Sequence, residues 1–227
     1  MESGLDQHYL ETFDFAQLCP EHVDLEIIEV DLIVYLDDQG YCDEGGHAAA
    51  NKTKQRSANH FALWFRLKDS TTVSIDITQK NYTHNLGPTT EGSARVASIP
   101  TPDPSKTIPT PDAGCVMKET CNIRPGMTIR MVVELLYRQG LDLYRFKPTF
   151  NQHSGCRYWL YVFSYELEEF GVIGRGFADC VWRSMHVHYL RSKYQSAKGK
   201  RFKPGNAWGA SGEACANIIA GEFLLCV

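Results

Sequence analysis

Two adjacent segments with the pattern of a β-hairpin constrain the fold of this chain most. In residues 71–78, Val73, Ile75 and Ile77 share one side and polar residues share the other, which is the two-residue period of a strand. The preceding segment, 59–67, is rich in aromatic and aliphatic residues, and a short polar turn separates the two. The pair therefore predicts an antiparallel hairpin.

Other segments predict helices and further strands around this hairpin. Apolar residues recur at helical spacing in three places, each followed or bounded by turn residues. The predicted elements are strands at 24–36, 59–67 and 71–78, helices at 128–139, 156–170 and 175–192, an extended piece at 141–147 and an edge strand near 222–227. The residues expected to face the core are Met131, Val132, Leu135, Leu136, Leu160, Phe163, Leu167, Phe170, Phe177, Val181, Met185 and His188. This mixture predicts an α+β fold, with an antiparallel sheet packed against helices.

One proline-rich stretch interrupts the pattern. Residues 87–114 contain six prolines among many threonines and serines, which predicts an irregular excursion without a helix or a central strand. A long loop inside a domain is often functional, so we expect it near the site rather than between two domains. The chain is therefore predicted to form one domain over residues 1–227.

Composition excludes several classes of protein. Hydrophobic residues make up 43% of the chain, enough for a proper core, and the net charge of -4 lacks the basic excess typical of nucleic-acid binding. The densest basic run, 198–203, is expected to be a solvated loop. No stretch approaches the ~20 apolar residues of a membrane span. An acidic N-terminal segment without an apolar run is unlike a signal peptide, so a cytoplasmic location is expected.

The cysteines and histidines do not have the spacing of a metal site. There are eight cysteines and no CxxC pair, and reduced thiols are expected in a cytosolic protein. Cys115 and Cys121 have no nearby histidine cluster, and His186 and His188 diverge on a helix because they are two positions apart. No metal and no cofactor are therefore expected.

Cys156 is a candidate nucleophile because it opens the second predicted helix. The first turn of a helix has free N–H groups and the positive end of the helix dipole. These would lower the thiol pKa below the ~8.5 of free cysteine and favour a nucleophilic thiolate, with Ser154 or Gly155 as N-cap. The alternative is that Cys156 fills the core, as buried cysteines commonly do.

His60 and Asp76 fall on the same side of the predicted hairpin. His60 shares its strand side with Ala62 and Trp64, and the small Ala62 leaves room for a helix N-terminus to approach. A turn centred on Lys68 would place positions 60 and 76 opposite or diagonal to one another. A carboxylate there would orient the imidazole. The alternatives are a packed histidine and an aspartate that faces solvent.

These motifs resemble a known group of enzymes. His-x-Ala-x-Trp at a strand start, a polar residue on the next strand and Gly-Cys-x-x-Trp at a helix start resemble the circularly permuted papain-like cysteine enzymes. That group includes NlpC/P60 peptidases, lecithin:retinol acyltransferase-like enzymes and PPPDE proteins. Residues 59–61, 140–144 and 155–159 are also similar to an uncharacterised domain family of filamentous fungi. The resemblance covers about residues 24–190.

The resemblance implies a permuted papain-like fold and a role for each candidate residue. Cys156 takes the position of the nucleophile, His60 that of the base and Asp76 that of the orienting residue. The chain departs from the group in two places. Gly155 precedes the cysteine where the permuted enzymes often have asparagine, and Asp76 stands where they often have histidine or asparagine.

The sequence leaves three functions open. The first is a hydrolase or acyltransferase that acts on an amide, peptide or thioester/ester carbonyl through Cys156, His60 and Asp76. The second is a non-covalent tailoring enzyme of fungal secondary metabolism, a cyclase, isomerase or lyase, in which Cys156 has no role. The third is a non-catalytic binding protein with a decayed site. The residues expected to contact a small-molecule, acyl or peptide substrate are Asn59, Trp64, Tyr158 and Trp159. A homodimer is compatible with each function.

Overall fold

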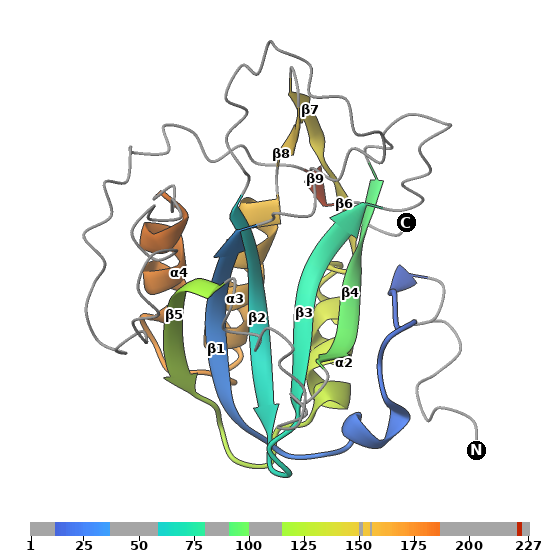
Figure 1. The fold of residues 1–227 in the computed structure, drawn as a ribbon, viewed down its shortest axis with the longest axis vertical. Helices are drawn as coiled ribbons and strands as arrows, with labels where there is room; N and C mark the ends of the chain where they lie inside the picture. Colours follow the sequence, from blue (N-terminus) through green and yellow to red (C-terminus); the bar gives the residue numbers. More distant parts are fainter. Residues whose placement is uncertain are drawn as a thin grey trace, which may run out of the picture.

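An antiparallel sheet forms the centre of the fold (Figure 1). The computed structural model describes residues 12–36, 59–79, 91–99, 115–149, 152–154, 156–186 and 222–223. The strands are β1 (Ile27–Leu36), β2 (Asn59–Leu67), β3 (Thr72–Gln79), β4 (Glu91–Ile99), β5 (Cys115–Asn122), β6 (Leu143–Arg145) and β9 (Glu222–Phe223), and a separate hairpin of β7 (Lys147–Thr149) and β8 (Gln152–Ser154). The helices are the 3-10 turn η1 (Pro20–His22), α2 (Ile129–Arg138), α3 (Cys156–Glu169) and α4 (Phe177–Met185). The strand order in the main sheet is β5-β1-β2-β3-β4-β6-β9.

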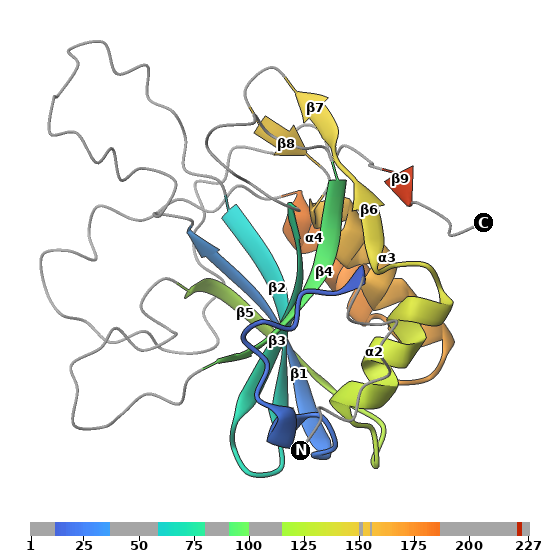
Figure 2. The ribbon, with the colours of Figure 1, turned by 90° about the vertical axis from the view of Figure 1, so that its right-hand side faces the viewer.

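The helices cover one face of this sheet, as Figure 2 shows. Phe61, Leu63 and Phe65 of β2 belong to the core cluster together with alternate residues of β1, β3 and β4. The ring of Phe65 lies 6.3 Å from that of Phe163 in α3. Each buried aliphatic or aromatic side chain of this kind contributes about 1.5–3 kcal/mol. The predicted α+β architecture, with an antiparallel sheet packed against helices, is confirmed.

The local signals at the start and end of α2 are also confirmed. Thr128 is the N-cap residue, and its side chain accepts a hydrogen bond from the Met131 backbone N–H. Gly140 follows the helix with a φ of 64°, a left-handed conformation that glycine adopts readily. The buried residues are Ile129, Val132, Val133 and Leu136. Met131 was expected to face the core, but it is exposed, because the buried face is rotated around the helix axis.

The second and third predicted helices correspond to α3 and α4. Leu160, Phe163 and Leu167 are buried in α3, as are Phe177, Val181 and Met185 in α4. The prediction for Phe170 is wrong, because this residue follows the end of α3 and is 48% exposed. His188 lies outside the described residues. The predicted edge strand near the C-terminal end is present as β9, which pairs with β6.

The prediction of an irregular stretch at 87–114 is wrong for residues 91–99, which form strand β4. β4 lies there between β3 and β6, inside the sheet. Pro88 and Pro100 flank this strand and none of the prolines lies within it, so every residue of β4 has an N–H group for the ladder. Gly92 allows a close approach, since a Cβ there would lie 2.4 Å from the ring of Phe146. The edge strand β5 was not predicted from the sequence either. The rest of this stretch lies outside the described residues.

The β2–β3 hairpin is paired over only part of its length. Its pairing in the described residues runs from Arg66↔Thr72 to Leu63↔Ile75. Both strands continue beyond that point, β2 paired with β1 and β3 paired with β4, and Figure 1 shows β2 and β3 separating toward their upper ends. We call the residues beyond the last pair, 59–62 and 76–79, the unpaired end. The register is centred on Asp69 rather than on Lys68, and the pairing ends before it reaches position 60 or 76. The expectation that these two positions are opposite or diagonal partners in the hairpin is therefore not met, because both lie in the part where the strands have separated.

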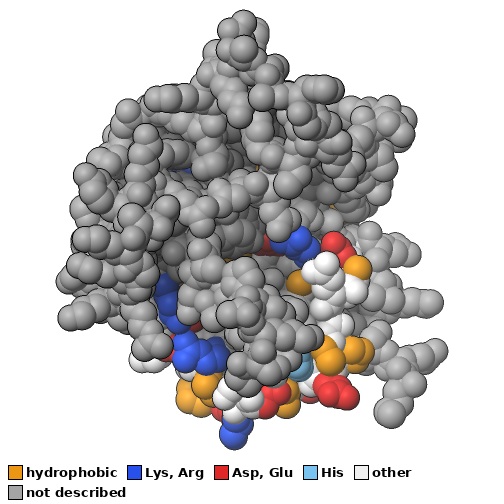
Figure 3. Space-filling model, viewed as in Figure 1, with side chains coloured by type: hydrophobic (Ala, Val, Ile, Leu, Met, Phe, Trp, Pro, Cys, Tyr) orange, Lys and Arg blue, Asp and Glu red, His pale blue; other side chains and the backbone are white. Residues whose placement is uncertain are grey.

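No helix in the described part of the chain has the length and apolar character needed to cross a membrane. On the face seen in Figure 3, the described side chains of Lys and Arg lie interspersed with those of Asp and Glu rather than as a patch of one sign.

Candidate functional site

The first turn of α3 lies against the sheet close to the unpaired end. The Arg157 guanidinium carbon lies 4.8 Å from the ring centroid of Phe61 in β2, a distance typical of a cation–π contact. The same guanidinium donates a hydrogen bond of 2.8 Å from Nη1 to the carbonyl of Met185 in α4. Arg157 therefore fixes the start of α3 relative to both β2 and α4. It places Cys156 near the strand that carries His60.

Cys156 is the first residue of α3, as the sequence indicates, but its electrostatic environment is the opposite of the expected one. The side chain is partly buried and packs against the core. Burial raises the pKa of the Cys156 thiol, the charge of Arg157 lowers it to a smaller extent, and the carboxylate of Asp76 raises it further. A raised pKa keeps the thiol protonated at neutral pH. The expected stabilisation of a thiolate is therefore not found.

His60 and Asn59 belong to β2 by their backbone, and their side chains lie outside the described residues. Position 60 pairs with Tyr35 of β1, and position 59 with Leu36. Because residues alternate along a strand, position 60 shares its sheet face with Ala62, two residues further on. That face is opposite the helices, since the odd-numbered residues of β2 belong to the core cluster.

Asp76 is buried and paired with Arg95. Only 1% of Asp76 is exposed. Arg95, directly opposite on β4, donates two hydrogen bonds to it, 3.0 Å from Nε to Oδ1 and 2.6 Å from Nη2 to Oδ2. Such a two-point contact between guanidinium and carboxylate fixes the orientation of both groups. The alternative that Asp76 faces solvent is wrong, and its carboxylate has a partner that the sequence analysis did not identify.

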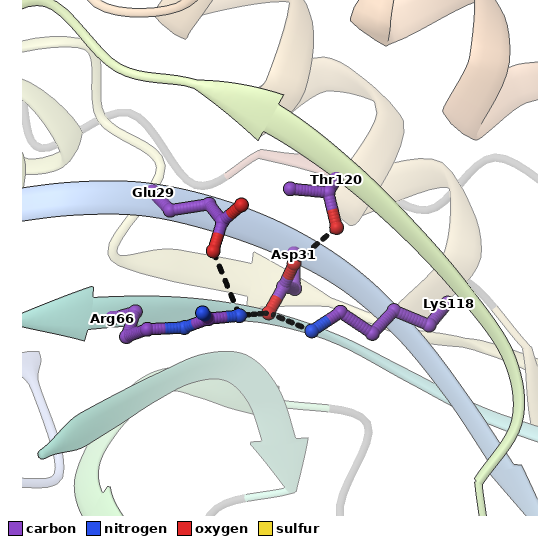
Figure 4. A network of polar contacts seen from close by, with 5 residues as sticks. All are labelled: Glu29, Asp31, Arg66, Lys118 and Thr120. Carbon is purple, nitrogen blue, oxygen red and sulfur yellow. Dashed lines mark hydrogen bonds and ion pairs between the residues drawn. The ribbon is translucent and has the colours of Figure 1, made fainter. Parts of the chain in front are cut away.

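A second cluster of charges lies on the same face of the sheet, around Asp31 (Figure 4). Asp31 is 4% exposed. Its carboxylate accepts a 2.6 Å hydrogen bond from Thr120 and lies 2.7 Å from Lys118 Nζ and 3.4 Å from Arg66 Nη2. Arg66 also pairs with Glu29 at 2.7 Å. Two acidic residues, Glu29 and Asp31, two positions apart in a largely aliphatic strand were the signal in the sequence for this cluster.

The two charged clusters flank an apolar patch at the centre of this face. Ile33 of β1 lies opposite Lys118 on one side and opposite Ala62 on the other. Ala62 is the last residue of β2 before the paired part begins, and Asp76 is the first residue of β3 beyond it. Ile33 and Ala62 are buried but lie outside the main core cluster. The face opposite the helices therefore has an apolar centre with fixed charges on either side.

The aromatic residues expected to bind substrate occupy three different environments. Trp64 is partly buried. Like Ala62, it belongs to the side of β2 that is turned away from the helices. Tyr158 is partly buried, with its ring centroid 6.4 Å from that of Phe223 in β9. The prediction for Trp159 is wrong, because its side chain is fully buried in the core and its Nε1 donates a 2.7 Å hydrogen bond to the carbonyl of Leu141.

The described groups of the site are a fixed pair of opposite charges, Asp76 and Arg95, and a thiol whose pKa is raised. The helix that carries Cys156 packs on one face of the sheet. Positions 60 and 76 are even-numbered positions of β2 and β3 and belong to the opposite face, because the odd-numbered residues of both strands lie in the core under the helices. Among the described side chains, no three His, Cys, Asp or Glu residues are grouped as metal ligands.

Comparison with known protein families gives one match. Residues 44–206 match the model of a family described as a domain of unknown function (DUF7770), and since this range is most of the chain, the chain belongs to that family. Comparisons with curated proteins and with solved structures gave no match.

Proposed function

We propose that this member of the DUF7770 family is an enzyme that acts on a small organic substrate by acid–base chemistry, without a covalent intermediate. The observation that carries the proposal is the buried Asp76 carboxylate, held at both oxygens by Arg95 where the pairing of β2 and β3 stops. Buried ionic groups cost desolvation energy, and titratable groups held in such settings are often functional. The reactions that suit this site are cyclisation, isomerisation and elimination.

Each of these reactions removes a proton at one atom and delivers it at another. His60, on the same register face as Asp76, takes the role of general base and acid, since imidazole titrates near neutral pH. The Asp76–Arg95 pair supplies fixed charges whose orientation does not change during the reaction, the kind of arrangement that stabilises developing charge.

A second candidate retains Cys156 as nucleophile. It is favoured by the position of Cys156 at the first residue of α3, whose neighbour Arg157 contacts Phe61 beside His60. In this permuted papain-like arrangement, Cys156 attacks an amide, peptide or thioester/ester carbonyl while His60 accepts its proton. Water or a second nucleophile then resolves the thioester. The raised pKa of the thiol makes this the weaker candidate.

One experiment separates the two candidates. The rate of alkylation of each cysteine by iodoacetamide is measured against pH by peptide mass spectrometry, in the wild type and in His60→Ala. The first candidate predicts that Cys156 reacts slowly, with the pH profile of a buried thiol in both proteins. Rapid reaction well below the free thiol pKa, lost in His60→Ala, would establish the second candidate instead.

A second experiment tests the acid–base chemistry directly. Exchange of carbon-bound protons for deuterium is followed by NMR for a panel of 1,3-dicarbonyl compounds with the full chain. The proposal predicts that at least one compound exchanges faster with the protein, that His60→Ala and Asp76→Asn abolish the effect, and that Cys156→Ala retains it. An accelerated exchange that Cys156→Ala removes would count against it, as would a panel on which the protein has no effect.

A further inference from the structure

Two cysteines lie outside the candidate site, one in the edge strand β5 and one in helix α4. Cys121 is in β5, the edge strand, opposite Val30 of β1, and Val30 belongs to the core on the helix side. Residues opposite one another on antiparallel strands point to the same face, so Cys121 faces the helices and packs against the core. Cys180 is in α4 and, like Cys121, is a free, partly buried thiol.

The connection between α3 and α4 brings these elements together. Arg124, just after β5, donates a 2.7 Å backbone hydrogen bond to Val172, and Ile123 forms an antiparallel bridge with Ile173. Gly174 follows, and a Cβ placed on it would lie 3.8 Å from the Cys121 sulfur. The chain then enters α4 three residues later.

The ionisation of Cys180 supports the same proximity. Burial raises the pKa of the Cys180 thiol most, and the nearby charge of Glu119 raises it further. Cys121 raises this pKa as well, by the smallest of the contributions. Glu119 and Cys121 are two residues apart on β5 and lie opposite the core residues Leu32 and Val30, so both belong to the strand face that is turned toward the helices.

We propose that Cys121 and Cys180 form a reversible disulfide when the protein is oxidised by a peroxide. The disulfide would link the edge strand β5 covalently to α4. One thiolate attacks hydrogen peroxide, forming a sulfenic acid and releasing hydroxide, which takes up a proton to become water. The second thiol attacks the sulfenic sulfur, forming the S–S bond and releasing a second water. Two thiols are oxidised and one peroxide is reduced. A dithiol reverses the reaction by exchange.

The disulfide would also bear on the start of α3. The carbonyl of Met185, at the end of α4, accepts the hydrogen bond of Arg157, so a tether on α4 restrains the turn that carries Cys156. This inference does not rest on the proposed function, since it requires only the two thiols and their elements. Because the pKa of Cys180 is raised, oxidation is expected to accelerate as the pH rises above neutral.

The test uses the folded, reduced full chain. It is treated with one equivalent of hydrogen peroxide at two pH values, blocked with N-ethylmaleimide and digested without reduction. Mass spectrometry is expected to find one dominant linked peptide, Cys121–Cys180, which forms faster at the higher pH and disappears with dithiothreitol. The melting temperature of the oxidised protein should rise by roughly 5–10 °C.

Matched variants make the result specific. Cys121→Ser and Cys180→Ser should each lose both the linked peptide and the rise in melting temperature, whereas Cys19→Ser, at a free cysteine beside η1, should keep both. Recovery of Cys121 and Cys180 as separately blocked or over-oxidised peptides in the wild type would overturn the proposal. So would a linked peptide that forms equally well in urea. The peptides recovered from the oxidised wild type show whether the Cys121–Cys180 disulfide forms, so the test holds even if a serine variant does not fold.

Discussion

Asp76 on β3 and Arg95 on β4 stand directly opposite one another, joined through both carboxylate oxygens at 3.0 and 2.6 Å. This pair lies on the sheet face away from the helices, beside the point where β2 and β3 stop pairing. It gives the candidate site a charge whose position is fixed by two neighbouring strands. If Asp76 orients His60, it does so with a carboxylate whose two oxygens already accept hydrogen bonds from Arg95.

The first prediction concerns the stability of this pair. Arg95→Met leaves the buried Asp76 carboxylate without this partner, and we expect a loss of about 3 kcal/mol, the lower end of the range for broken buried pairs, because Arg95 is itself 32% exposed. Urea denaturation measures the change. Arg130→Met is the matched control, since it breaks a two-point contact with Asp24 that is 68% exposed, and it should cost less than about 1 kcal/mol. Equal losses in both variants would contradict the burial argument.

The second prediction concerns the pH dependence due to Cys156. Burial raises the pKa of its thiol in the folded state, so the folded state favours the protonated form. The resulting stability is fully present below the unfolded-state pKa of about 8.5 and is lost as the pH rises through the folded-state pKa. Wild type should therefore lose stability relative to Cys156→Ser above about pH 8.5. The difference in unfolding free energy between the two proteins, measured from neutral to alkaline pH, tests this. A difference that grows in favour of the wild type would show a lowered pKa.

The third prediction separates the two tryptophans that were both expected to contact substrate. Trp159→Phe removes the hydrogen bond to Leu141 and leaves a void in the core, with an expected cost of about 2–4 kcal/mol. Trp64→Phe, on the opposite face and only partly buried, should cost less than about 1.5 kcal/mol. Thermal and urea unfolding of both variants provide the comparison. A larger loss for Trp64→Phe would mean that the assignment of Trp159 to the core is wrong.

The fourth prediction concerns the close packing of β4. A methyl group on Gly92 would lie 2.4 Å from Phe146 and 2.9 Å from the carbonyl oxygen of Thr78, so Gly92→Ala should destabilise the protein by about 1–3 kcal/mol. Gly174→Ala is the control, because its added Cβ would meet Cys121 at an ordinary contact distance of 3.8 Å. The melting temperatures of the two variants decide the matter. If Gly92→Ala melts at the wild-type temperature, β4 and Phe146 are not packed as described.

Local signals in the sequence were sufficient for most of the regular structure. The alternation of Val73, Ile75 and Ile77 predicted β3, and Thr128 and Gly140 predicted the bounds of α2 to within a residue. Cys156 was correctly placed at the start of α3. These features depend on backbone preferences and on side chains a few residues apart, which a single segment contains.

The candidate site depended more on contacts between distant segments. The prolines around residues 91–99 suggested an irregular stretch, yet β3 and β6 provide hydrogen-bonding partners on both sides of β4. Arg95 was overlooked as the partner of Asp76 for the same reason. The chain belongs to a family described as a domain of unknown function. The chemistry proposed for this site therefore rests on the geometry of the site.

The sequence by itself determined the strands β1 to β3 and the three α-helices, and that they build an antiparallel sheet covered by helices, whereas β4 and β5 were not predicted. Only the tertiary structure decided that β2 and β3 part before their ends, that Arg95 neutralises Asp76, and that burial raises the pKa of Cys156. Periodicity and capping are local properties of the chain. Strand register, burial and the electrostatic effect of one side chain on another arise from segments that meet only when the chain has folded.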